Sequence, residues 1–142
     1  QKCCTKAGSF RYSLTRSTGR TSFEITAASL STLNAAGEFA LEERARGMEY
    51  LRRSIESAER GRKGAFRAAR NFPFYGNFYA GQVLQQSRGA VWKRWSESVW
   101  PRLLELQKDV GSWESRFGDE YGTAMALLNL ELPLGYLPLY DR

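Results

Sequence analysis

Gly8-Ser9-Phe10 returns as Gly64-Ala65-Phe66 and again as Gly111-Ser112-Trp113, at intervals of 56 and 47 residues. Each copy consists of a glycine, a small residue and an aromatic residue. Self-similarity at a period of a few tens of residues is typical of proteins built from repeated supersecondary units. The three copies therefore predict a chain of about three structural repeats.

A second marker follows each copy and keeps nearly the same periods. These markers are Thr26-Ala27, Tyr79-Ala80 and Thr123-Ala124. They lie in stretches of small, aromatic or weakly polar residues with almost no charge. Because a helix with little charge on any side is usually covered by other elements, we expect enclosed helices over 21–36 and 74–87. A third enclosed helix is expected to stop near Pro133.

Charged segments lie between the enclosed stretches. Apolar residues recur in them every three or four positions, which is the spacing of one helix face. The first segment carries Leu41, Ala45, Met48, Leu51 and Ile55, and the second carries Trp92, Trp95, Val99, Leu103 and Leu106. We expect an outer, half-solvated helix in each segment. In the second, one helix is expected to end near Val99 and a new one to begin near Pro101.

Glycine and proline set the expected boundaries of these helices. Gly37 and Gly89 follow the two enclosed helices, where a left-handed residue commonly ends a helix. Residues 71–73 favour a turn into the second enclosed helix, and residues 57–70 hold little apolar material and favour an exposed connection. No segment shows the sustained alternation that predicts a strand. The sequence therefore predicts an all-α fold of paired inner and outer helices.

The composition excludes several kinds of site. The chain has 142 residues, a net charge of +6 and no histidine, so the commonest metal ligand and general base are missing. Cys3 and Cys4 form one adjacent thiol pair, which is too few ligands for a zinc site. The sequence thus predicts no metal, no cofactor and no complete active site. Arginines are frequent over 44–70, but glutamates are interleaved, which favours a solvated face over a nucleic-acid surface.

Gln107, Gly111 and Trp113 are spaced as in the QW motif of squalene–hopene cyclases, which this segment resembles. The tail over 121–140 is similar to the closing segment of bacterial proteins with prenyltransferase/squalene-oxidase repeats, and the stretch 75–80 followed by Trp92 and Trp95 also fits this group. Gln1 with Gly8 and Phe10 resembles an earlier copy of the motif, and Gly64 with Phe66 a degenerate one. The resemblance implies an α/α toroid, of which this chain would supply a partial (α/α) barrel.

The expected organisation is one domain over residues 1–142, with repeats at about 1–56, 57–106 and 107–142. Because the chain lacks an initiator methionine, we expect it to be the C-terminal part of a longer protein. In each motif, an aromatic ring in a tight glycine-containing turn is expected to wedge between helix pairs. The amide of Gln107 is expected to satisfy exposed groups at a helix end.

The catalytic residues of the resembling enzymes have no counterparts here. Cyclases protonate an alkene with an aspartate of an aspartate-rich motif, whereas Asp109, Asp119 and Asp141 are isolated. Prenyltransferases hold zinc with aspartate, cysteine and histidine, and this chain has no histidine. The favoured hypothesis is a non-catalytic helical-repeat module that binds a protein or a hydrophobic, lipid-like ligand. The alternative is the C-terminal portion of a terpenoid cyclase or prenyltransferase whose catalytic residues lie upstream.

The candidate ligand-binding residues gather at the start of the second enclosed helix. They are Phe74, Tyr75, Asn77, Phe78 and Tyr79. Their aromatic rings could face a hydrophobic, isoprenoid-like ligand, or they could form the core between paired helices. The open end of a toroid fragment further predicts self-association or contact with a missing upstream part of the chain. Lys93, Arg94 and Glu97 interrupt the tryptophans of the second outer segment, which disfavours membrane attachment there.

Overall fold

A computed structural model describes residues 3–15, 19–61 and 64–135, and these residues form an all-α fold. The described chain contains three isolated antiparallel bridges but no strand. In order, its helices are α1 (Phe23–Ala35), α2 (Glu42–Arg60), the short 3-10 helix η1 (Ala65–Ala68), α3 (Pro73–Ser87), α4 (Ala90–Glu105), α5 (Asp119–Glu131) and the 3-10 helix η2 (Leu132–Leu134). The prediction of an all-α chain is confirmed.

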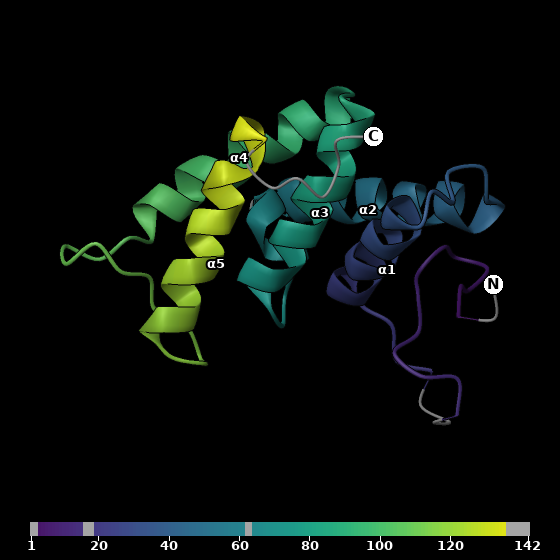
Figure 1. The fold of residues 1–142 in the computed structure, drawn as a ribbon, viewed down its shortest axis with the longest axis horizontal. Coiled ribbons are helices and arrows are strands. Elements are labelled where there is room, and N and C mark those ends of the chain that lie inside the picture. The colour runs from purple at the N-terminus through teal and green to yellow at the C-terminus, as the bar shows by residue number, and fades with distance from the viewer. Residues whose placement is uncertain (1–2, 16–18, 62–63, 136–142) are drawn as a thin grey trace.

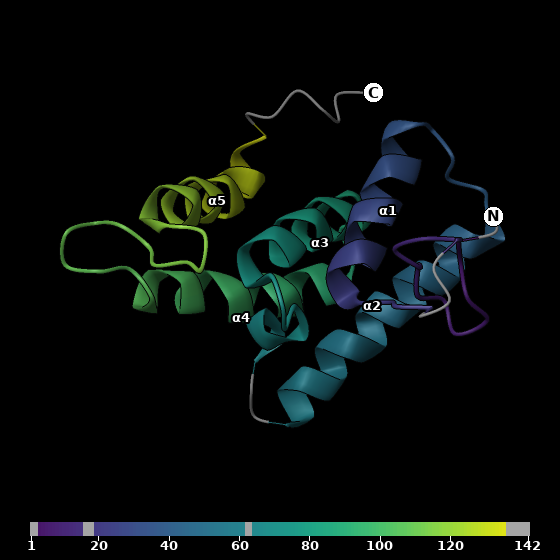
Figure 2. The ribbon, with the colours of Figure 1, turned by 90° about the horizontal axis from the view of Figure 1, so that it is seen from below.

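The helices lie in two layers. In one layer α3 packs between α1 and α5, and in the other α2 packs beneath α1 while α4 packs beneath α3 (Figure 2). The helices of the first layer run in the same direction, so their first turns lie along one edge of the molecule (Figure 1). The expected enclosed helices correspond to α1 and α3, and the expected outer helices correspond to α2 and α4.

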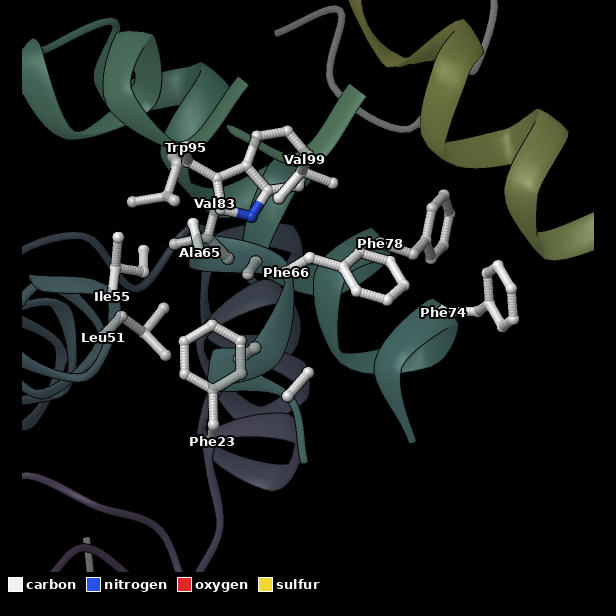
Figure 3. Packing of buried hydrophobic residues seen from close by; sticks show 14 of the residues in the cluster. Phe23, Leu51, Ile55, Ala65, Phe66, Phe74, Phe78, Val83, Trp95 and Val99 are labelled. Carbon is white, nitrogen blue, oxygen red and sulfur yellow. The ribbon is translucent and has the colours of Figure 1, made fainter. Parts of the chain in front are cut away.

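The core lies where the two layers meet. Leu51 and Ile55 of α2 and Trp95 and Val99 of α4 are fully buried, and both helices pack against η1 (Figure 3). On each helix the two residues are four positions apart and so lie on the same face. One face of each outer helix therefore packs into the core. The predicted apolar stripes are therefore confirmed at these positions, although Ala45 of the first stripe is exposed.

Three expected boundaries are wrong. Helix α4 continues through Pro101. The proline ring is exposed to solvent, and the proline removes only one backbone N–H, so the rest of the helix keeps its hydrogen bonds. Arg88, not Gly89, adopts the left-handed conformation that ends α3, while Gly89 is the extended residue before α4. The described residues of the stretch 57–70, which are 57–61 and 64–70, do not form an exposed connection. Helix α2 extends to Arg60, and η1 buries both Ala65 and Phe66.

Two turns at opposite ends of the chain have the same hydrogen bonds. Residues 4–10 and 107–113 are each closed by an antiparallel bridge between their first and last residue. Inside the first, the bonds are Thr5 N to Ser9 O (2.9 Å) and Gly8 N to Thr5 O (3.0 Å); inside the second, they are Lys108 N to Ser112 O and Gly111 N to Lys108 O (both 2.8 Å). The glycine in each turn has a positive φ, as does Gly64 in the middle copy.

Each turn is also tied to the helix that follows it. The backbone N–H of Phe10 donates to the hydroxyl of Thr26 (3.0 Å), and that of Trp113 donates to the hydroxyl of Thr123 (3.1 Å). Thr26 and Thr123 are the residues that mark the repeat in the sequence. Cys4 holds the place in the first turn that Gln107 holds in the second. Gln1, which belongs to the first copy of the motif in the sequence analysis, lies outside the described residues, as does the closing segment 136–142.

Candidate functional site

The five predicted ligand-binding residues separate into two groups. Phe74 and Phe78 are buried in the core, where Phe74 meets Phe66 edge to face at 6.0 Å (Figure 3). Asn77 is fully buried. Tyr75 and Tyr79 are half-buried and contact each other at 4.7 Å between ring centroids. Of the five, Tyr75 lines a cleft at the surface.

Asn77 joins three elements through hydrogen bonds of its side chain. Its amide nitrogen donates to the carbonyls of Phe66 and Pro73, both at 2.9 Å, and its amide oxygen accepts from the indole N–H of Trp95 at 3.1 Å. The side chain thus joins η1, α3 and α4. A buried amide must find partners, and here all of them belong to the core.

The cleft that Tyr75 lines lies where the first-layer helices begin. It has a volume of about 730 Å³ and is bordered by residues just before or within the first turn of α1, α3 and α5. Its lining residues are Tyr12, Ser13, Arg20, Ser22, Glu24, Ile25, Asn71, Phe72, Tyr75, Phe117 and Tyr121. A cavity of this size suits a small organic molecule. We take this aromatic cleft as the candidate site.

Aromatic rings form much of the wall of the aromatic cleft. Phe72 and Phe117 stack with their centroids 5.8 Å apart, and Phe117 meets Tyr121 edge to face at 5.2 Å. The guanidinium of Arg116 lies over both phenylalanine rings, at 5.4 Å from Phe72 and 5.2 Å from Phe117. Phe117 is 53% exposed and Tyr12 is 72% exposed, so these rings present apolar surface to solvent.

The phenols of Tyr75 and Tyr121 stay neutral near neutral pH. Burial raises the pKa of Tyr75, and the neighbouring phenols of Tyr79, Tyr121 and Tyr12 raise it further. Burial also raises the pKa of Tyr121, with a smaller contribution from Tyr79. A neutral phenol both donates and accepts hydrogen bonds beside an apolar ring face. These residues therefore suit a ligand that is mostly apolar and has a small polar group.

Glu24 is the buried acid of the aromatic cleft. Its side chain lies in the first turn of α1, with only 2% of the residue exposed. Its Oε1 atom accepts the backbone N–H groups of Asn71 (2.8 Å) and Phe72 (3.3 Å), which precede α3. Gly76 leaves room for this contact, because a methyl group there would lie 2.6 Å from Cγ of Glu24. Glu24 thereby fixes the start of α3 against α1.

A second, more polar cleft adjoins the first. It has a volume of about 580 Å³, shares Ser22, Glu24 and Asn71 with the aromatic cleft, and carries Arg53, Arg67 and Arg70. Arg53 donates to the carbonyl of Ala7 and pairs with Glu49. Glu24 thus lies between an aromatic and a basic surface.

The motif residues make contacts within the fold, and the contact of Gln107 differs from the one expected for it. The indole N–H of Trp113 donates to the carbonyl of Leu103 at 2.6 Å, so the tryptophan satisfies the end of α4. The amide of Gln107 instead donates to Gly111 O (3.0 Å) and closes its own turn. Trp113 is buried and so reaches the end of α4, whereas Gln107 is exposed and bonds within its own turn. Phe10 and Phe66 are likewise buried in the core.

Sequence reasoning missed most of the aromatic cleft. Phe72, Phe117 and Tyr121 precede or open helices, and nothing local indicates that three helix starts converge. Glu24 did carry a signal, because it is the one acidic residue in an otherwise uncharged stretch that was expected to be enclosed. A charge at a covered position needs partners, and here they are the N–H groups before α3.

Neither a metal site nor a membrane-spanning helix is found among the described residues. No three acidic or cysteine side chains there lie close enough to hold a metal ion, and no helix is long and apolar enough to cross a bilayer. Comparison of the chain with protein-family models, with curated proteins and with solved structures finds no match.

Proposed function

We propose that this chain is a non-catalytic helical-repeat module that binds an apolar, isoprenoid-like ligand in the aromatic cleft. The observation that carries the proposal is the convergence of rings from the starts of α3 and α5, together with Tyr12, on one cavity. Rings that remain partly exposed beside a cavity gain free energy when a ligand covers them, at about 25 cal/mol per Å² of apolar surface removed from water.

We further propose that the two helix layers form part of an α/α toroid. Helices α1, α3 and α5 would make the inner wall, and α2 and α4 would make the outer wall. The repeated turns at 4–10 and 107–113 support a repeating unit, because each binds the helix after it through a threonine hydroxyl. In this arrangement the aromatic cleft lies at the end of the inner wall, where the chain enters each inner helix.

The proposal is tested by titrating the protein with farnesol, a neutral isoprenoid alcohol, and measuring the heat of binding. Phe117→Ala should weaken binding about tenfold, because covering half of a phenylalanine side chain contributes roughly 1.4 kcal/mol. Phe39→Ala is the matched control. Phe39 is 54% exposed and has Arg44 over its ring at 5.3 Å, yet it does not line the aromatic cleft.

Equal losses from the two substitutions would locate binding elsewhere on the surface and contradict the aromatic cleft as the site. Absence of farnesol binding by the unsubstituted protein would contradict the proposed ligand class. Because Phe39 and Phe117 are similarly exposed, a general effect of surface aromatic content on solubility would act on both variants alike.

A further inference from the structure

The carboxylate of Glu24 has one oxygen without a hydrogen-bond partner among the described residues. Oε1 accepts two backbone N–H groups, whereas no donor of the described residues bonds to Oε2. Among the described residues, Oε2 is not one of the polar side-chain atoms that are both fully buried and without a partner, so part of its surface is accessible. Glu24 lines both the aromatic cleft and the polar cleft, so an accessible Oε2 can accept a hydrogen bond from a ligand in the aromatic cleft.

No cationic side chain of the described residues pairs with this buried acid within 4.0 Å. Two arginines belong to or border the aromatic cleft: Arg20 lines it but is exposed, and Arg116 lies on the rings of Phe72 and Phe117. Arg67 and Arg70 border the polar cleft and are exposed. The positive end of α3 partly offsets the charge through Oε1. A buried carboxylate with an open oxygen remains a strong acceptor for a charged donor.

Resting on the proposed function, we infer that the aromatic cleft selects an apolar ligand whose polar end is a hydrogen-bond donor, a protonated primary amine. The ammonium group would donate to Oε2 of Glu24, and the apolar chain would lie along Phe72, Tyr75 and Tyr121. Ring faces also attract cations, as the position of Arg116 over two rings of this wall illustrates. A ligand ending in a carboxylate would place like charges together and bind less well.

The test compares three probes with the same chain and different polar ends: octylammonium, 1-octanol and octanoate, each titrated calorimetrically at pH 7. An alkylammonium is protonated at this pH, since a primary amine titrates near 10.4. Octylammonium should bind about tenfold more tightly than octanol, because a hydrogen bond to a charged group contributes more than a neutral one. Octanoate should bind most weakly of the three.

Glu24→Gln provides a second test, because it replaces the acceptor Oε2 with an amide nitrogen, which is a hydrogen-bond donor. The glutamine carbonyl can keep the two N–H bonds from Asn71 and Phe72, which leaves its amide nitrogen facing the cleft as a donor. Octylammonium should then lose its advantage and octanoate should gain. Glu38→Gln is the control, since it removes the same charge from an exposed residue outside the cleft and should leave the order of the probes unchanged.

The outcomes separate the inference from the proposed function. If octanol binds as tightly as octylammonium, or octanoate binds best, the donor preference is overturned while apolar binding stands. If no probe binds, the proposed function itself fails, and the inference fails with it. Circular dichroism checks that Glu24→Gln is folded. Should it not fold, the order of the three probes on the unsubstituted protein decides alone.

Discussion

Replacing Asn77 with alanine removes the side chain that joins η1, α3 and α4. The change leaves the indole N–H of Trp95 and the carbonyl of Phe66 without a partner, and both residues are buried. Each buried group that loses its partner costs roughly 1–3 kcal/mol, so the expected loss in free energy of unfolding is about 4 kcal/mol. At an m value of about 2 kcal/mol per M, the urea midpoint should fall by about 2 M.

Urea denaturation followed by tryptophan fluorescence and by circular dichroism measures this loss. Asn71→Ala is the control, because Asn71 is exposed and, within the described part of the chain, bonds through its backbone N–H and not its side chain. That variant should stay within about 0.5 kcal/mol of the unsubstituted protein. If Asn77→Ala falls within 1 kcal/mol of the control, the three-element contact does not stabilise the fold as argued.

A double-mutant cycle isolates the bond between Asn77 and Trp95. Trp95→Phe alone leaves the amide oxygen of Asn77 without its donor, and the double variant removes both groups. The two losses should therefore sum to more than the loss of the double variant, by about 1–2 kcal/mol. Strict additivity would show that the two side chains contribute independently.

Two further predictions concern packing and pH. Gly76→Ala should destabilise the fold more than Gly47→Ala, as measured by thermal denaturation, because its methyl group would meet Ala69 and Glu24 at 2.6 Å, whereas the one at Gly47 meets the flexible end of Leu30. Lys108 holds the pKa of Asp119 below its ordinary value of 3.8 through a 2.8 Å bond. This contribution to the free energy of unfolding is present above pH 4 and disappears as the pH falls through the lowered pKa. In Asp119→Asn the free energy of unfolding, measured by urea denaturation, should therefore fall less steeply with decreasing pH below pH 4.

The helices could be predicted from the sequence because each has a local cause. Leu51 and Ile55 mark the buried face of α2, and the uncharged stretches mark α1 and α3. Boundaries were harder where one residue's preference competes with its surroundings. Pro101 favours a break, but the buried contacts of Val99 and Leu103 on either side keep α4 continuous.

The site could be predicted only in part. Tyr75 was expected to face a ligand and does line the aromatic cleft, while Phe74, Asn77 and Phe78 face the core. Whether an aromatic residue at a helix start points into a cleft or into a core depends on which neighbouring helix covers it. That relation joins segments such as α1 and α5, which lie far apart in the sequence, and no local spacing reports it.

The stacking of helices along one row also sets how the molecule opens. Helix α3 is covered by α1, α4 and α5, whereas α5 packs mainly on α3, and Leu127 of α5 and Leu134 of η2 are 46% and 58% exposed. In such a linear array, the stability of each unit depends on its nearest neighbours. Amide protons of α5 should therefore exchange with solvent through openings that leave the rest folded, while those of α3 should exchange only when the whole core unfolds.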